Sequence, residues 1–387
     1  MKIINLSSIA NPISISVQNP SRSDYDRFIG LEHYDSGEPV ITRFQGTELL
    51  TTSAKAFKAN DILIARRNVY LKRAGIVFFD GITSGDSIIL RLKEDTQKTI
   101  GYSREDLIRY IPFMLNSEHF WIYANKHADG MNSKRISKDT LLEYEFELPS
   151  IDEMRDISDK LWAAYRLKEA YKKLLVTTDE MVKSQFIEMF ENVESYCKLE
   201  DLISDTFPGE WGSEPISENA IKVIRTTNFT NEGYLDLTDV VTRDIEPKKV
   251  VRKKLKQGDT ILERSGGTKD NPVGRVVFFD EIGDYLPNNF TQVLRPKESV
   301  NPVYLFYALY NSYNLNKAAM RAMASQTTGI QNLSMSDFMA KSIVLPSRDE
   351  QNKFEQIYRQ ADKSKSVIQK ALVYLNDIQS DELGKIA

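Results

Sequence analysis

This sequence of 387 residues is poor in cysteine and histidine, and it has no long apolar run. Its one cysteine, Cys197, rules out an intrachain disulfide framework and is typical of a reducing cytosol. The three histidines, His33, His119 and His127, are widely spaced, which argues against a zinc site. No stretch approaches the ~18 consecutive apolar residues of a membrane span, and the first 20 residues lack the apolar core of a secretory signal. We therefore expect a cytoplasmic protein.

The sequence also lacks a basic excess. Lys and Arg number 51 against 55 Asp and Glu, which gives a net charge of −4. Nucleic-acid binders usually show a basic balance, so any DNA-binding surface has to be a local one. The apolar share of 41% and the charged share of 27% are those of a folded globular protein. The length fits two to three domains of ~100–200 residues each.

The chain repeats itself at a period of nearly 200 residues. Three pieces recur in the same order: FKANDILIAR (57–66) as LKQGDTILER (255–264), VFFD (77–80) as VFFD (277–280), and Leu-Pro-Ser (148–150) as Leu-Pro-Ser (345–347). Because a repeat of this length and order indicates a duplicated structural unit, we interpret the chain as two copies of one unit.

Each copy is predicted to contain a mixed α/β module and a long helix, which makes the fold class α+β. Short β-like runs such as DILIA and DTILE alternate with Gly, Asn and Pro residues. The predicted domains are 1–150 and 193–347, two α/β modules, and 151–192 and 348–387, two long helices.

The segments after the two Leu-Pro-Ser motifs have a narrow apolar stripe. Asp152 and Asp349 place acids in the first turn, where the helix dipole favours them. The stripe residues recur every three or four positions: Met154, Ile157, Leu161, Ala164, Leu167, Tyr171, Leu174, Met181, Phe186 and Met189, then Phe354, Ile357, Ala361, Ile368, Ala371, Leu375 and Ile378. Such stripes are typical of coiled-coil seams. We expect the two helices to pair antiparallel, with the modules related by a pseudo-two-fold axis; the alternative is that each helix pairs with a separate partner.

Polar, basic loops supply the candidate DNA-binding residues. They follow the repeated Lys-x-x-Asp strand, precede the last strand of each copy, or lie in one further turn: Arg66, Arg67, Asn68, Lys72, Arg73, Lys134 and Arg135 in the first copy, and Arg225, Asn228, Arg264, Ser265, Thr268, Lys269, Gln326, Thr328 and Gln331 in the second. Arginine reads guanine bidentately, amide side chains read adenine, and glycines let backbone N–H groups approach phosphates. The alternative is that these are ordinary solvated turns and capping loops.

Motifs that resemble catalytic ones are incomplete. Ser265-Gly-Gly-Thr-Lys269 lacks the spacing of a phosphate-binding loop. Asp259 and Glu263 resemble a metal-nuclease pair, but Ala65 stands where a repeated Glu263 would be. No nucleophile elbow and no His-Glu-x-x-His motif is present. We therefore predict no catalytic site and no metal site.

Several pieces are similar, in their order, to one known pattern: Ile29–His33, Asn60–Leu63, Phe79–Asp86, Lys183–Phe190, and Leu345–Ser347 with Glu350 and Gln351. Together with the duplication, they make the chain resemble, over essentially its whole length, the specificity subunit of type I restriction–modification enzymes.

The resemblance implies a non-catalytic subunit that reads a bipartite, asymmetric site in double-stranded DNA, with one half per recognition domain. It implies two modification subunits that bind S-adenosylmethionine and methylate adenine, and restriction subunits that use ATP and Mg²⁺. No cofactor is expected in this chain, and its acidic charge implies that partners supply part of the phosphate contacts. Two other interpretations stay open: a stand-alone DNA methyltransferase or nuclease, and a DNA-free coiled-coil scaffold.

Overall fold

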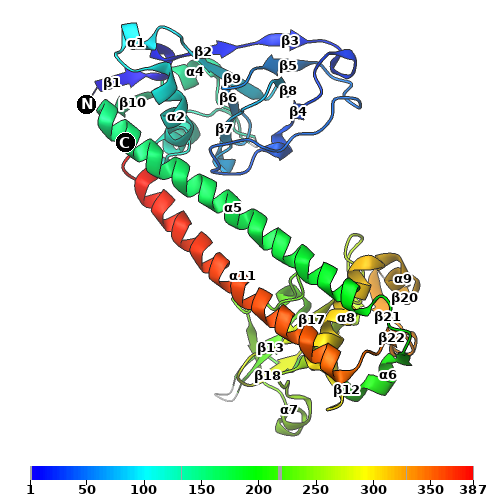
Figure 1. Cartoon of the computed structure of the whole chain (residues 1–387). Coiled ribbons are helices and arrows are strands. Elements are labelled where there is room, and N and C mark those ends of the chain that lie inside the picture. The colour runs from blue at the N-terminus through cyan, green and yellow to red at the C-terminus, as the bar shows by residue number, and fades with distance from the viewer. Residues whose placement is uncertain (1, 132, 217–219, 328, 387) are drawn as a thin grey trace. The chain divides into compact units, whose positions relative to one another are not determined.

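The computed structural model of this chain describes residues 2–131, 133–216, 220–327 and 329–386. It divides into unit 1, residues 1–173 and 368–387, and unit 2, residues 174–367. Each unit contains one α/β module and part of both long helices, as the colours of Figure 1 show. Among the described residues, no helix is long and apolar enough to cross a membrane.

Unit 1 is built on two four-stranded sheets. The first has the order β2 (Ala10–Ile13), β9 (Ser87–Leu92), β6 (Ile62–Ala65) and β7 (Ala74–Ile76), and all its pairs are antiparallel. The second has the order β3 (Ile15–Val17), β5 (Ala54–Phe57), β8 (Gly81–Thr83) and β4 (Phe28–Ile29), with β4 and β8 parallel.

Both faces of β6 are buried, which explains its continuous apolar run. Ile62 and Ile64 pack into the cluster that includes α2 (Arg104–Met114) and α3 (Glu118–Lys126), whereas Leu63 joins the cluster on the opposite face. Side chains alternate between the two faces of a strand, so a strand covered on both sides has to be apolar throughout.

Unit 2 repeats the first sheet with the same strand order. Its strands are β12 (Ile203–Pro208), β19 (Thr291–Pro296), β15 (Asp259–Glu263) and β17 (Val276–Phe279), again all antiparallel. The parallel pair also recurs, as β13 (Ile221–Ile224) with β18 (Tyr285–Pro287). Helix α8 (Pro302–Leu315) packs against β15 and β17. The predicted duplication and the mixed α/β modules are therefore confirmed.

A two-stranded sheet closes each module where the long helix begins. In unit 1 it pairs β1 (Lys2–Asn5) with β10 (Glu145–Leu148), and in unit 2 it pairs β11 (Tyr196–Lys198) with β22 (Ser342–Val344). Both pairs are antiparallel, and both bring the first strand of the module beside the strand that leads into the Leu-Pro-Ser motif.

The repeated Lys-x-x-Asp motif has a structural role in both units. Asp61 is 1% exposed and accepts hydrogen bonds from Lys58 N (2.8 Å) and from Arg91 Nε and a terminal nitrogen (2.7 Å each). Asp259, equally buried, accepts from Lys256 N (2.8 Å) and from Arg295 Nε (2.8 Å). Each carboxylate thereby fixes the turn before its strand and ties it to the neighbouring strand, and its hydrogen bonds raise the pKa of the arginine.

The Leu-Pro-Ser motif begins the long helices α5 (Ile151–Phe190) and α11 (Arg348–Leu383). Ser150 N donates to Glu153 Oε2 (3.0 Å), and Glu153 N donates to Ser150 Oγ (3.3 Å). Ser347 and Glu350 exchange the same two bonds at 2.9 and 3.4 Å. These are capping boxes, which satisfy backbone donors that the first helical turn leaves free.

The two helices run antiparallel within each unit. In unit 1, Lys168 Nζ donates to Gln379 Oε1 (2.8 Å); in unit 2, Lys365 Nζ contacts Asp179 Oδ1 (2.5 Å). The helices therefore pair with each other, as predicted, whereas the pseudo-two-fold relation of the modules stays a prediction. The predicted stripe is wrong in its middle: Leu167, Leu174 and Met181 are 42–47% exposed. At the ends, Met154 and Phe354 are buried against the modules.

Candidate nucleic-acid interface

In unit 1, the loop after β6 and the stretch before α4 (Lys138–Leu142) form one surface. Asn68 N donates to Lys134 O (2.7 Å), and Ile136 N donates to Arg66 O (3.0 Å). Arg67 Nε donates to Ser133 Oγ (2.9 Å). Two polar stretches that are about 65 residues apart in the sequence thus act together.

Unit 2 brings together the corresponding segments. The loop after β15 forms β16 (Ser265–Gly266), which pairs with β21 (Ile330–Leu333); β21 also pairs with β20 (Ala324–Thr327). Ser265 Oγ donates to Asn332 Oδ1 (2.8 Å). Gly267 has a φ of +67°, and a Cβ there would lie 2.7 Å from Val273 N, so this turn requires glycine.

The two surfaces share one backbone frame. Arg66 O accepts from Ile136 N, and Arg264 O accepts from Leu333 N at 2.8 Å. The N–H of each arginine donates, at 2.9 Å, to the carbonyl of a residue beside the next strand, Asp86 O for Arg66 and Phe290 O for Arg264. The duplication therefore extends to the loops, although their side chains differ.

Lys134 is exposed on the unit 1 surface, and so are two arginines, Arg67 and Arg135. The two arginine side chains are 46% and 47% exposed, and both face Asp86, at 4.0 and 3.8 Å. Neighbouring Lys55 donates to Gly85 O and Ser87 O (2.9 and 3.0 Å), and its pKa is lowered by burial and by the charge of Arg66. A cluster with this excess of positive charge attracts phosphate oxygens or the acceptor edge of guanine.

The unit 2 surface is less charged. Thr268 and Lys269 are exposed, and Thr268 closes its turn by accepting from Asn271 N (3.0 Å). Arg264 is half-buried, and one of its terminal nitrogens donates to Gln292 Oε1 at 3.5 Å. Gln331 Oε1 accepts from Val273 N (3.3 Å). Hydroxyl and amide groups dominate this surface.

Five of the expected DNA-binding residues hold parts of the fold together. Arg73 donates to Leu31 O and Arg67 O (3.0 Å each), and burial lowers its pKa. Lys72 is held by Glu118 at 2.6 Å. Asn228 is 3% exposed and donates to Asp236 O and Asp239 O, and Arg225 donates to Asp239 O. Ser265, although at the surface loop, is also 7% exposed and engaged with Asn332. Their polar groups hold neighbouring loops, which is a structural role, and contact of these residues with DNA stays a prediction.

The pair of Asp259 and Glu263 is likewise structural. Glu263 is 2% exposed, and its Oε2 accepts from Arg275 Nε at 2.7 Å, while Oε1 accepts from Gly267 N at 3.3 Å. Both carboxylates thus accept hydrogen bonds from arginine side chains and backbone N–H groups of the fold. Of the remaining candidates, Thr328 and the side chain of Gln326 lie outside the described residues.

The sequence analysis missed the groups that orient the candidate residues. Asp86 faces two arginines, Ser133 accepts from Arg67 and donates to Asn68 Oδ1 (3.1 Å), and Asn332 receives Ser265. A small polar residue within a polar loop gives no signal of this kind. The repeat alignment of the two polar stretches was the only available clue.

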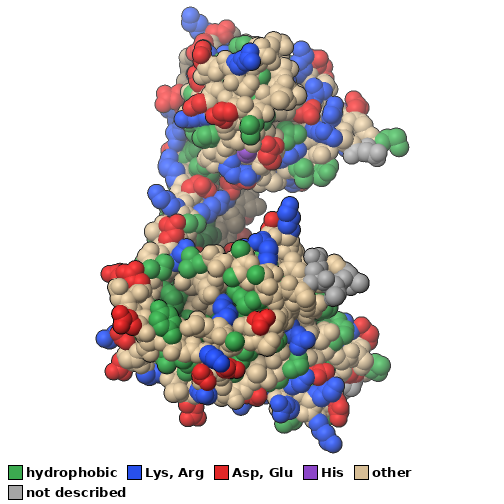
Figure 2. Space-filling model, turned by 90° about the vertical axis from the view of Figure 1, so that its right-hand side faces the viewer, with side chains coloured by type: hydrophobic (Ala, Val, Ile, Leu, Met, Phe, Trp, Pro, Cys, Tyr) green, Lys and Arg blue, Asp and Glu red, His purple; other side chains and the backbone are tan. Residues whose placement is uncertain are grey.

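The charge on the surface is mixed. On the face shown in Figure 2, Lys and Arg side chains are interspersed with Asp and Glu on each unit. This agrees with the net charge of −4 and confines a DNA-binding surface to local groups such as those above.

Comparison with known proteins gives one family and a shared fold. Residues 207–372 match the model of the type I restriction modification DNA specificity domain. No curated protein matches. The solved S subunit of a type I restriction–modification system from M. genitalium is 13% identical, with a TM-score of 0.60 over 99% of this chain and 94% of that chain. A chain from a structure on complex assembly and conformational transition of the type I R-M system is 15% identical, with a TM-score of 0.55 over 99% and 96%. At these identities the likeness shows the fold, and it extends over both copies.

Proposed function

We propose that this chain, whose residues 207–372 match the model of the type I restriction modification DNA specificity domain, belongs to that family and reads a bipartite DNA target with one unit per half. The family is the DNA-recognition component of these systems and not a catalytic one. One observation carries the proposal: a common backbone frame presents different polar side chains in the two units. A constant frame with variable groups is what reading two unlike half-sites requires.

The chemistry of the two surfaces supports unlike half-sites. In unit 1, the guanidinium groups of Arg67 and Arg135 are forks of donors that match guanine N7 and O6 or a phosphate. In unit 2, Thr268, Lys269 and Gln331 offer hydroxyl, ammonium and amide groups, which read a different set of base edges.

Exchange of one module tests this directly. A hybrid in which residues 1–150 come from a relative of different specificity, assembled with its modification subunits, is expected to direct methylation to a site with one half changed and the other half kept. Long-read mapping of methylated adenine in cells that carry the hybrid measures both halves. A change in both halves would contradict the one-unit-per-half assignment. A DNA-free scaffold would instead show no target binding and no fall of affinity with salt.

We further propose that the helices dock modification subunits. Within unit 2, the α5 side chains of Leu174, Val176 and Met181 are 45–59% exposed, and within unit 1, Val373 and Tyr374 of α11 are 61–67% exposed. Apolar residues on an exposed helix face are typical of protein contacts. The modification subunits would bring S-adenosylmethionine, and the restriction subunits would bring ATP and Mg²⁺, with no cofactor held by this chain.

The paired helices are also proposed to set the gap between half-sites. One heptad inserted near Leu174 and one near Ile368 adds ~10 Å at ~1.5 Å per residue, which corresponds to about 3 base pairs. Mapping of the methylated sites is expected to show a gap lengthened by about that amount. An unchanged gap would mean that helix length does not set the spacing.

A further inference from the structure

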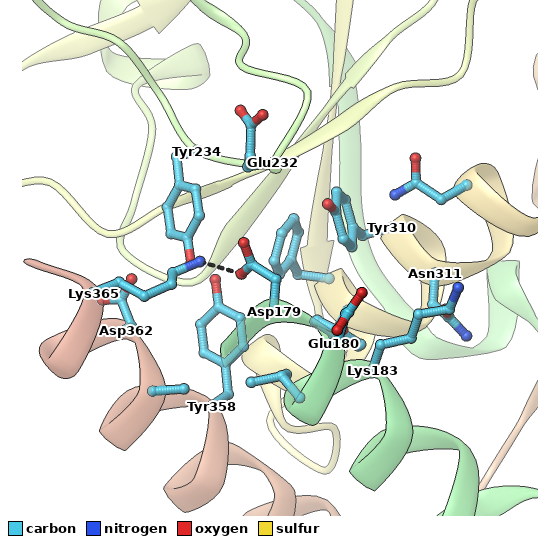
Figure 3. Close-up of a pocket in the computed structure, with 15 residues that line it drawn as sticks. Asp179, Glu180, Lys183, Glu232, Tyr234, Tyr310, Asn311, Tyr358, Asp362 and Lys365 are labelled. Atoms are coloured by element: carbon cyan, nitrogen blue, oxygen red, sulfur yellow. Dashed lines mark hydrogen bonds and ion pairs between the residues drawn. The ribbon is translucent and has the colours of Figure 1, made fainter. Parts of the chain in front are cut away.

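A cavity of about 250 Å³ lies in unit 2, where α5, α8 and α11 meet the loop that contains Tyr234 (Figure 3). It lies apart from the candidate interface, and none of its lining residues belongs to the loops described above. Its wall is rich in aromatic rings: Tyr234, Phe306, Tyr307, Tyr310 and Tyr358. The floor and rim carry charged groups from α5 and α11.

The wall already holds one ammonium group. Lys365 is 8% exposed, and its Nζ lies 4.5 Å from the centroid of the Tyr234 ring and 2.5 Å from Asp179 Oδ1, the contact dashed in Figure 3. Aromatic faces attract cations, and the attraction grows when the cation is desolvated. The geometry of Lys365 shows that this wall stabilises a buried alkylammonium.

Further acceptors in the cavity are unused. Glu180, Glu232 and Asp362 line it and form no ion pair among the described residues. With Asp179, Lys183 and Lys365, the wall carries four carboxylates and two ammonium groups, a net charge of −2. The cavity is therefore electronegative although one lysine already occupies part of it.

Two neutral polar side chains of the cavity lining are free to bind a ligand. Tyr307 and Asn311 are 6% and 9% exposed, both line the cavity, and neither side chain makes a hydrogen bond among the described residues. Their polar atoms are not among the fully buried ones and line the cavity, so a ligand that enters it can hydrogen-bond to them. Burial raises the pKa of Tyr307, which keeps its hydroxyl neutral and able to accept or donate.

We propose that this cavity binds a small aliphatic diamine in its doubly protonated form. A dication neutralises the wall charge of −2. Its N–H groups donate hydrogen bonds to the carboxylate, amide and hydroxyl oxygens of the wall, and its methylene chain packs on the aromatic rings. The volume lies below the range of ~300–1,000 Å³ for drug-sized ligands, so the ligand is small. The site does not depend on the proposed DNA reading.

Calorimetric titration of the full chain with 1,4-diaminobutane at low ionic strength tests the proposal. Saturable binding of one diamine per chain is expected. The double variant Glu180→Gln, Asp362→Asn is expected to bind about tenfold more weakly, because each charge of this exposed kind contributes about two- to fivefold. Tyr307→Phe keeps the ring and is expected to weaken binding by about tenfold through loss of the hydroxyl. Neither change removes an ion pair, and thermal melting checks that the fold is kept.

Matched titrations decide the ligand class. Glu298→Gln removes an exposed acid of the same unit outside the cavity and is expected to leave binding unchanged. An equal loss in that variant, or no saturable binding at all, would overturn the proposal. Equal affinity for tetramethylammonium would overturn the role of N–H donors. Tighter binding of N-acetyl-lysine amide than of the diamine would overturn the free-amine assignment in favour of a lysine of a partner protein.

Discussion

The loops after β6 and β15 are the most informative comparison in this protein, because their backbones agree and their side chains do not. In unit 1 the frame presents Arg67 and Arg135 around Asp86. In unit 2 it presents a glycine turn at Gly267 with Thr268 and Lys269 at its tip. The strand partners and the backbone bonds of Arg66 and Arg264 are the same. The two units therefore share the backbone frame and differ in most of the side chains that it presents.

The residues that stayed the same are those that carry the fold. Asp61 and Asp259 are buried, and both make the same bonds to a backbone N–H and to an arginine. A buried carboxylate without its partner is costly, so replacement of either member alone is disfavoured. The difference between the two classes of residue is the basis of the predictions below.

The largest expected effect is on the shared frame. Asp61→Ala and Asp259→Ala are each expected to lower the free energy of unfolding by about 3 kcal/mol, because each leaves a largely buried arginine without its carboxylate. Denaturant titration measures both. Asp35→Ala, which removes an ion pair to Arg43 with both side chains about half exposed, is expected to cost less than about 1 kcal/mol. A large effect in one unit only would break the equivalence of the frames.

The variable groups are expected to affect recognition in one half-site each. Arg67→Ala and Arg264→Ala should each reduce discrimination at one base of their own half by about 1–3 kcal/mol, or else lower the salt slope by about one unit if the contact is to phosphate. Binding of the assembled complex to target and random duplexes across a salt series distinguishes these results.

Lys72→Ala is the matched control for the arginine variants, because its ammonium is held by Glu118. Its affinity and salt slope should stay at the wild-type values. If Arg67→Ala also behaves as wild type, the loop after β6 is only a solvated turn. The difference between the side chains of the two loops then has no bearing on DNA recognition.

The smallest effect is expected at the helix starts. Ser150→Ala and Ser347→Ala each remove an N-cap and should lower the free energy of unfolding by about 1 kcal/mol. Ser364→Ala, whose hydroxyl only returns to Gln360 O within α11, should change stability far less. Thermal melting ranks the three variants, and unequal effects of the two caps would show that the two helix starts differ in stability.

The same caps predict a pH dependence. The hydrogen bonds from Ser150 and Ser347 lower the pKa of Glu153 and Glu350. A carboxyl whose folded pKa is depressed stabilises the fold above its unfolded pKa, and this contribution is lost as the pH falls through the folded value. Melting curves between about pH 5 and pH 2 should therefore be less steep in pH for the two serine variants than for the wild type.

Much of the architecture follows from the sequence. The order of the repeated pieces predicts two equivalent modules, because segments of similar sequence pattern form similar strands and turns. The Leu-Pro-Ser motifs and the glycine-free segment 152–190 predict where the long helices run, since capping and helix propensity act within a few residues. The Lys-x-x-Asp repeat indicates that its aspartates have a shared role, but the sequence does not show that each of them binds an arginine of the neighbouring strand.

The site followed less well, because exposure depends on residues far away in the chain. Nothing local distinguishes Arg73, which braces Leu31, from Arg67, which is open to solvent. The side chain of Asn228 donates to the carbonyl oxygens of Asp236 and Asp239 and is buried by their loop. In an exposed loop, the same amide group would be free to hydrogen-bond to a base.

By itself, the sequence of this protein determined the duplication, the helix starts and the loops that follow the repeated strands, since these depend on short-range patterns. Only the tertiary structure decided which loop residues are braces, that the two polar stretches of each copy share one surface, and that Leu174 and Met181 lie outside the helix seam. The physical reason is that burial and ion pairing are properties of neighbours in space, and folding brings together residues that the sequence keeps apart.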